Sequence, residues 1–244
     1  MADLSTLRIH LAGAFRWAAR LGMHESIANH FSVATGDDGR QFLLNPVGAH
    51  FSRIRASDLL LLNADDPASQ TGPKAPDPTA WSLHSELHRR LPQARCVLHT
   101  HMPHATALAC LKDFEFLMLD QNACRFYQRI AYDRDYAGMA LQADEGARVA
   151  ALMGPGKSVL FMGNHGVIVV GQSVAHAFDE LYYLEKAAQL QILALSTGRP
   201  LQLVPPDVAA LACAQWNDYP TRFSELHFNA LLTLLNEQEP DYRL

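Results

Sequence analysis

Two histidines separated by one residue, His99 and His101, end the short apolar run that starts at Cys96. In a β-strand, residues two apart point to the same face, so this spacing predicts that both imidazoles project together from the carboxyl end of a buried strand. Two neutral imidazoles on one face form half of a metal site. A third ligand must come from elsewhere, and we assign His165, because its glycine-flanked turn lets a ring approach a metal without backbone crowding.

Three protein nitrogens leave coordination positions open, which is the arrangement of a catalytic ion. Without His165, a structural role for the histidine pair would be the main alternative; with His165, metal binding is favoured. Zinc is the first expectation for the metal. Manganese, iron(II) and cobalt are the alternatives, because imidazole ligands discriminate weakly among these ions.

Two further patterns resemble functional motifs without matching them. His84 and His88 stand four residues apart as in a zinc protease, but Glu86 follows the first histidine by two positions and would point away from the histidine face, towards the surface. The glycines before Lys157 do not complete a phosphate-binding loop, and a turn before a strand accounts for them.

Helices and strands alternate along the chain and predict a sheet covered by helices. An amphipathic repeat predicts a helix over residues 4–21, and a Gly-Asp-Asp-Gly turn predicts a hairpin. A proline-rich loop spans residues 64–78. The remaining expected strands are residues 95–101 and two segments within 158–170. The remaining expected helices are a helix that begins at Pro103 and the ranges 79–90, 174–196, 207–216 and 221–235.

The amino-acid composition limits the classes of protein to which the chain can belong. The 244 residues are 49% hydrophobic and 18% charged, and the formal net charge of −5 with no basic cluster argues against nucleic acid and anionic membrane partners. No run of roughly 18 apolar residues predicts a membrane span. Four widely spaced cysteines and a start without a signal pattern predict free, mostly buried thiols and a cytoplasmic location.

Several motifs together resemble the class II aldolase and adducin head-domain family, over about residues 5–200. They are His84-Ser-Glu-Leu-His88, Val97-Leu-His-Thr-His101, Asn164-His-Gly166, Asn45-Pro-Val-Gly48, Ala56-Ser-Asp-Leu59, Ala177-Phe178 and Tyr182-Tyr-Leu-Glu185. The resemblance implies one three-layer α/β/α domain over residues 1–244 around a mainly antiparallel sheet, with C-terminal helices in 205–237. It also implies a homotetramer with sites between subunits, and His99, His101 and His165 as metal ligands.

The sequence departs from the family pattern at the acid/base carboxylate, which falls on Ala80. The phosphate-binding positions also differ, since Ala28 and Val47 replace a glycine and a hydroxyl residue, and a non-phosphorylated substrate is expected. Asn29, Gly48 and Arg129 are the expected substrate-binding residues, with Arg129 holding a carboxylate. The nominated acid/base residues are His104, Tyr132 and Gln121, with core packing as the alternative for the tyrosine.

Three functions follow as hypotheses. The first is a metal-dependent carbon–carbon lyase, an aldolase or a decarboxylase, that acts on a small hydroxy acid, oxo acid or carbonyl compound. The second is a non-catalytic adducin-like binding or scaffold module. The third is iron-dependent oxygen chemistry, since three-histidine sites also hold iron.

Overall fold

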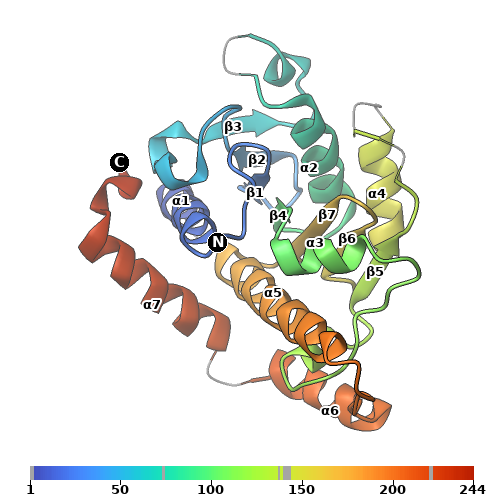
Figure 1. The fold of residues 1–244 in the computed structure, drawn as a ribbon. Coiled ribbons are helices and arrows are strands. Elements are labelled where there is room, and N and C mark those ends of the chain that lie inside the picture. The colour runs from blue at the N-terminus through green and yellow to red at the C-terminus, as the bar shows by residue number, and fades with distance from the viewer. Residues whose placement is uncertain (1–2, 73–74, 137, 140–143, 220–221) are drawn as a thin grey trace.

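A seven-stranded mixed sheet forms the centre of the molecule in the computed structural model, which describes residues 3–72, 75–136, 138–139, 144–219 and 222–244 (Figure 1). The strands are β1 (His30–Ala34), β2 (Gln41–Leu44), β3 (Leu60–Asn63), β4 (Cys96–Thr100), β5 (Ile130–Asp133), β6 (Val159–Met162) and β7 (Gly166–Gly171). Their order in the sheet is β3-β2-β1-β4-β7-β6-β5. All neighbouring pairs are antiparallel except β5 and β6, so the predicted mainly antiparallel sheet is confirmed.

Helices cover both faces of this sheet. They are α1 (Leu4–Arg20), α2 (Pro78–Arg90), α3 (Pro103–Ala109), α4 (Glu145–Met153), α5 (Val174–Ser196), α6 (Pro206–Asn217) and α7 (Phe223–Gln238). Figure 1 shows α2 and α4 lying side by side, with α1, α3 and α5 on the other side of the sheet. The predicted three-layer α/β/α class is therefore confirmed.

Alternation along β4 decides which side chains each layer covers, because successive residues of a strand point to opposite faces. Val97 packs with Leu83 and Leu87 of α2, in a core cluster that α4 also joins. Leu98 belongs to the larger core on the other face, with residues of α1, α3 and α5. His99 therefore projects on the α2 side of the sheet.

The expected hairpin is present as the antiparallel pair β1 and β2. The predicted loop 64–78 contains a short 3-10 helix at Pro67–Gln70, and α2 begins at Pro78, where Asp77 caps it through the backbone N–H groups of Thr79 and Ala80. β3, β5 and α4 have no counterpart in the sequence expectation.

The two C-terminal helices pack against different parts of the molecule. α7 contacts α5 and α1, and α6 contacts the 3-10 helix Ala123–Phe126. The expected last helix began at residue 221, which lies outside the described residues; α7 begins at Phe223 and ends at Gln238. None of the helices in the described part of the chain is long and apolar enough to cross a bilayer.

Candidate metal centre

Three histidines meet at the carboxyl end of β4. His99 is in β4, His101 follows it, and His165 lies in the turn that joins β6 to β7. Because β7 runs antiparallel to β4 and pairs Val167 with Thr100, the turn comes back beside the end of β4. One ring nitrogen from each histidine lies within 4.8 Å of the others, and no other such group of metal-ligating side chains occurs among the described residues.

Hydrogen bonds fix the tautomers of two of these rings. His99 Nδ1 lies 3.1 Å from the carbonyl of Val167, and His101 Nδ1 lies 2.5 Å from a carboxylate oxygen of Glu25. Both partners are acceptors, so both Nδ1 atoms carry the proton and donate it. In the neutral rings the Nε2 atoms are therefore bare lone pairs, which is the form that binds a metal.

The two Nε2 atoms lie 3.2 Å apart. Two bare lone pairs cannot form a hydrogen bond with each other, and a shared cation resolves their repulsion. Zinc–nitrogen bonds of 2.0–2.1 Å in a tetrahedral site place two ligand nitrogens about 3.3 Å apart. The spacing of His99 and His101 therefore fits a zinc-sized ion held by both rings.

Burial keeps two of the candidate ligands, His99 and His165, neutral. Burial lowers the pKa of His165 to about 4, with a further contribution from the neighbouring His101, and burial also lowers the pKa of His99 well below its ordinary value. Both rings are unprotonated at neutral pH, so no proton has to be removed from them when a metal binds.

Gly166 makes room for His101. A Cβ atom at position 166 would lie 2.7 Å from Cδ2 of His101 and 2.7 Å from the carbonyl oxygen of Thr100, so a side chain cannot enter without displacing one of them. Asn164, just before the ligand, has a φ of 54° in the left-handed region, which turns the chain sharply after β6. The turn therefore lies directly against His101, with no space for a side chain at position 166.

The expected substrate residues Asn29 and Gly48 lie in adjoining loops. Asn29 is buried; its side-chain oxygen accepts from the backbone N–H of Glu25 at 2.6 Å, and its Nδ2 has no partner among the described residues. Asn45 connects the loops, because its amide donates to the carbonyl of Asn29 at 3.4 Å. Gly48 has a φ of +76° and open space beside it. The Asn29 segment thus contacts Glu25 directly, and the loop that holds Gly48 contacts the same segment through Asn45 and through His50, whose ring lies against His24.

The nominated acid/base residues His104 and Tyr132 turn away from the three ligands. His104 Nδ1 lies 2.7 Å from Glu185 of α5, the same carboxylate that accepts from the first backbone N–H groups of α3. Tyr132 stacks on Phe161, which belongs to the core on the α5 side of the sheet, whereas His99 projects on the α2 side. Side-chain alternation along β5 therefore places Tyr132 on the other face of the sheet from the candidate metal, and the contact with Glu185 holds the His104 ring against α5.

Gln121 and Arg129 lie elsewhere in the chain. The carbonyl of Gln121 accepts from Nε1 of Trp216 in α6. Arg129 precedes β5, which runs parallel to β6, so it lies at the opposite end of the sheet from the turn that holds His165. Its guanidinium lies 3.2 Å from the buried carboxylate of Glu180, which gives it a structural partner in place of a substrate carboxylate.

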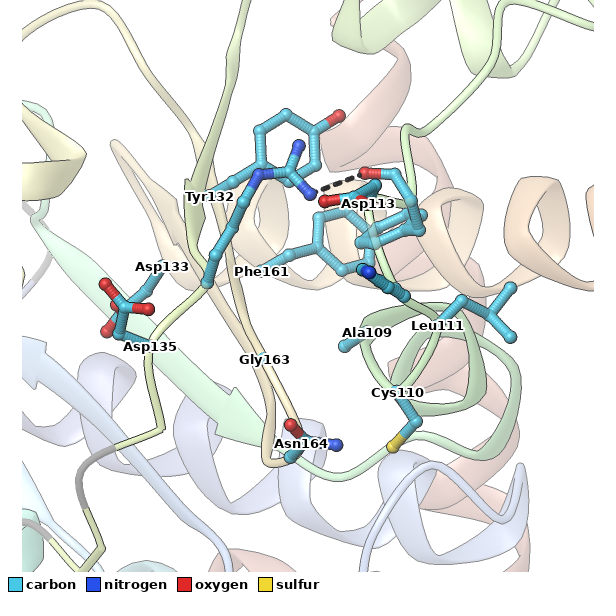
Figure 2. Close-up of a pocket in the computed structure, with 13 residues that line it drawn as sticks. Ala109, Cys110, Leu111, Asp113, Tyr132, Asp133, Asp135, Phe161, Gly163 and Asn164 are labelled. Atoms are coloured by element: carbon cyan, nitrogen blue, oxygen red, sulfur yellow. Dashed lines mark hydrogen bonds between the residues drawn. The ribbon is translucent and has the colours of Figure 1, made fainter.

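A cavity of about 500 Å³ lies beside the turn at Gly163 and Asn164. Figure 2 shows Tyr132, Phe161 and Asp113 at one end of it and Cys110 and Asn164 at the other. Tyr132 and Phe161 line this cavity, and both pack with the core on the face of the sheet opposite to His99. It is not the space in front of the three ligands.

Sequence reasoning missed Glu25 and the buried polar residues behind the ligands. Glu25 stands in an irregular segment before β1, and nothing in its spacing relates it to His101, 76 positions later. His30, Ser32, His84 and His88 are all buried between β1 and α2. Their alternation in β1 and their four-residue spacing in α2 signalled shared faces, yet only the packing of α2 on β1 brings the two pairs together.

The family model described as "Class II Aldolase and Adducin N-terminal domain" matches residues 9–192 of the chain. The chain belongs to this family. A crystal structure of an aldolase II superfamily protein from Pseudomonas syringae covers 100% of the chain and 97% of its own, with 33% identity and a TM-score of 0.87. The class II aldolase fold therefore holds over the whole described chain.

Two curated relatives carry different functional names. "Decarboxylase NovR" of Streptomyces niveus is 29% identical over 221 residues, covering 87% of the chain and 81% of that protein. Rat alpha-adducin is 30% identical over 201 residues, covering 81% of the chain but only 27% of adducin. The class II aldolase and adducin family thus includes both an enzyme by name and a domain of a larger protein, and the site must decide between them.

Ala80, the position predicted for the family's acid/base carboxylate, lies in α2. It is buried and packs with Phe42, Leu44, Leu62 and Trp81 in a small apolar cluster. A methyl group in an apolar cluster can neither donate nor accept a proton. Chemistry at this site that requires proton transfer needs another group.

Proposed function

We propose that the protein is a metal-dependent carbon–carbon lyase that acts on a small, non-phosphorylated hydroxy acid, oxo acid or carbonyl compound. The observation that carries the proposal is the 3.2 Å distance between the Nε2 atoms of His99 and His101, whose Nδ1 atoms each face an acceptor, with His165 beside them. Three nitrogen ligands leave positions at which a substrate can chelate the ion. A purely structural zinc site would use a fourth protein ligand instead.

A divalent metal bound there would act as a Lewis acid on a substrate carbonyl or carboxylate. Glu25 holds the His101 ring in the metal-binding tautomer, and the Val167 carbonyl does the same for His99. Asn29 and Gly48 are proposed to line the substrate side, because their loops adjoin Glu25. We propose zinc as the metal, with manganese, iron or cobalt as alternatives that metal analysis separates.

A small substrate is favoured because the cavity that His165 lines is small, at about 10 Å³. Tyr136 lines the same cavity, and its ring lies 6.2 Å from that of His165. A cytoplasmic location and a homotetramer belong to the same proposal. In such an assembly Gln121 is available to a neighbouring copy, since it is remote from the ligands of its own chain.

The proposal is tested by turnover. Purified, metal-loaded protein is screened against short 2-oxo acids for release of carbon dioxide and against hydroxyaldehyde adducts for release of aldehyde, with His165→Ala as the matched control. Turnover that disappears in the control supports the lyase. No turnover with any member of either set argues against it.

The similarity to alpha-adducin favours a second candidate, a binding or scaffold module without catalysis. This alternative predicts little metal in the purified protein and a partner interaction that His99→Ala does not weaken. Iron-dependent oxygen chemistry is separated from both by oxygen uptake in the iron-loaded protein, which the lyase does not require.

A further inference from the structure

Another cavity lies at the end of the sheet opposite to the metal ligands, where β7 leads into α5. Its volume is about 490 Å³, which is within the usual range of small-molecule sites. The first two turns of α5, the 3-10 helix Ala123–Phe126, the end of α6 and the start of α7 line it. We call it the α5 cavity. Because β7 spans about 17 Å between the turn that holds His165 and α5, the cavity is separate from the metal centre of the same chain.

Arg125 is the buried cation of this cavity, and it has donors to spare. The residue is 5% exposed and lines the cavity. Its Nη2 pairs with the carboxylate of Asp179 and lies 3.7 Å from Glu180, whereas its Nε and Nη1 have no hydrogen-bond partner among the described residues. Buried side-chain donors are nearly always hydrogen-bonded. The guanidinium therefore retains capacity for an acceptor from outside the chain.

Two aromatic rings lie against this guanidinium. Arg125 Cζ is 4.4 Å from the ring centroid of Tyr183 and 4.6 Å from that of Trp216. Trp216 also lines the α5 cavity. Such rings shield the guanidinium from water, and a hydrogen bond between a cation and an anion is stronger where water is excluded. The surroundings of Arg125 thus favour an anionic acceptor.

The acids that line the α5 cavity are all paired with cations. The pairs are Asp179 with Arg125, Glu180 with Arg129, and Glu225 with Arg222. Asp179 also lies 2.7 Å from Nδ1 of His227, and Glu180 accepts from the hydroxyl of Ser158 at 3.0 Å. Because these carboxylates already have donors and their charges are balanced by arginines, donors rather than acceptors remain for a ligand.

The N-terminus of α5 adds donors to the same cavity. This helix of 23 residues is capped by Ser173, whose side chain accepts from the backbone N–H of His176. The first N–H groups of a helix have no acceptor within it and carry a partial positive charge. His176 Nδ1 accepts from the backbone N–H of Gln172 at 3.2 Å, and burial lowers the pKa of His176, so the ring is neutral with its proton on Nε2. Gln172, Ser173 and His176 share the cavity with Arg125.

We propose that the α5 cavity binds a small anion that carries a carboxylate or a phosphate, held by the guanidinium of Arg125, the Nε2–H of His176 and the N-terminus of α5. Oxygen atoms of such a ligand accept hydrogen bonds from all three, and its negative charge is stabilised by the arginine and by the helix dipole. This site does not depend on the proposed lyase function.

The test is isothermal titration calorimetry of the purified full-length protein with sodium phosphate and, separately, with sodium acetate, at constant ionic strength. We expect saturable binding, and the anion that binds more tightly identifies the class of ligand. Arg125→Lys keeps a cation beside Asp179 but lacks the unpaired guanidinium nitrogens. Its affinity should be about 10–100-fold weaker, because hydrogen bonds to a charged group are lost.

Two further variants locate the site. Arg129→Lys is the matched control, because Arg129 also pairs with Glu180 but is not among the residues that line the α5 cavity, and it should bind the anion like wild type. His176→Asn keeps an acceptor for the N–H of Gln172 and removes the Nε2–H, so its affinity should be about 3–10-fold weaker. This variant decides the matter if circular dichroism shows that Arg125→Lys does not fold.

Three results would overturn the proposal. The first is the absence of saturable binding of either anion. The second is wild-type affinity in the folded variants at Arg125 and His176, which would mean that the anion binds elsewhere. The third is loss of binding in the His99→Ala, His101→Ala double variant, which would assign the anion to the metal centre; we expect that variant to bind it like wild type.

Discussion

Gly166→Ala should weaken metal binding without any change to a ligand. The new Cβ would lie 2.7 Å from His101 Cδ2, whereas carbon atoms in contact are about 3.5–4.0 Å apart, so the ring must move by roughly 1 Å. Metal–nitrogen bonds tolerate about 0.2 Å of error, and a shift of this size costs the site one of its three ligands. Even the loss of a group that only hydrogen-bonds to a metal ligand lowers the affinity for the metal about 10–100-fold.

We therefore expect an affinity loss of about 100-fold or more, which corresponds to about 2.8 kcal/mol. The assay is zinc titration in competition with a chromophoric chelator, with circular dichroism to establish that the variant is folded. Gly36→Ala is the control, since its Cβ would meet only Asp38 Oδ1 at an ordinary 3.4 Å. A folded Gly166→Ala protein with wild-type zinc affinity would refute the assignment of His101 as a ligand.

Three further predictions concern the surroundings of the site and the core. Glu25→Ala, which removes the acceptor for His101 Nδ1, should lower zinc affinity about 10–100-fold in the same chelator assay. The melting temperature of the metal-free protein should fall as the pH drops from 6.5 towards 4, because unfolded histidines take up protons that His30 and His165, with folded pKa values of about 3 and about 4, do not. Arg125→Met, which leaves the His227 ring as the remaining partner of the buried Asp179 carboxylate among the described residues, should cost about 3 kcal/mol in urea unfolding.

Each of these predictions has a clear contrary result. Unchanged zinc affinity in Glu25→Ala would show that the carboxylate does not orient the ligand. A melting temperature that stays level between pH 6.5 and 4 would contradict neutral buried histidines. For the arginine, Arg40→Met is the control, because its ion pairs are exposed and should contribute less than about 0.5 kcal/mol; equal losses in both variants would contradict the special role of Arg125.

The sequence predicted that His99, His101 and His165 lie close together, because the geometry that joins them is local. The two-residue period of a strand is sufficient to place His99 and His101 together, and a glycine-flanked turn is sufficient to expose His165. The class of fold followed from alternating elements and from the family motifs. The four cysteines are free, with only Cys110 exposed, in agreement with the expectation of mostly buried thiols.

The sequence did not predict the features that depend on which helices and strands pack together. Short strands such as β5 and the nine-residue α4 carry too few residues for a clear period. Tyr132 and His104 are close to the ligands along the chain or the sheet, but the face on which each side chain projects removes them from the site. The His30–His84 contact joins residues 54 positions apart and exists only because α2 covers β1.

The central claim is that His99, His101 and His165 hold one divalent ion. Elemental analysis of untagged protein, with wild type compared with the His99→Ala, His101→Ala double variant, tests it most directly. We predict close to one metal ion per chain in wild type and none in the folded double variant. Metal absent from both proteins, or retained by the double variant, would contradict the claim and favour the adducin-like binding module.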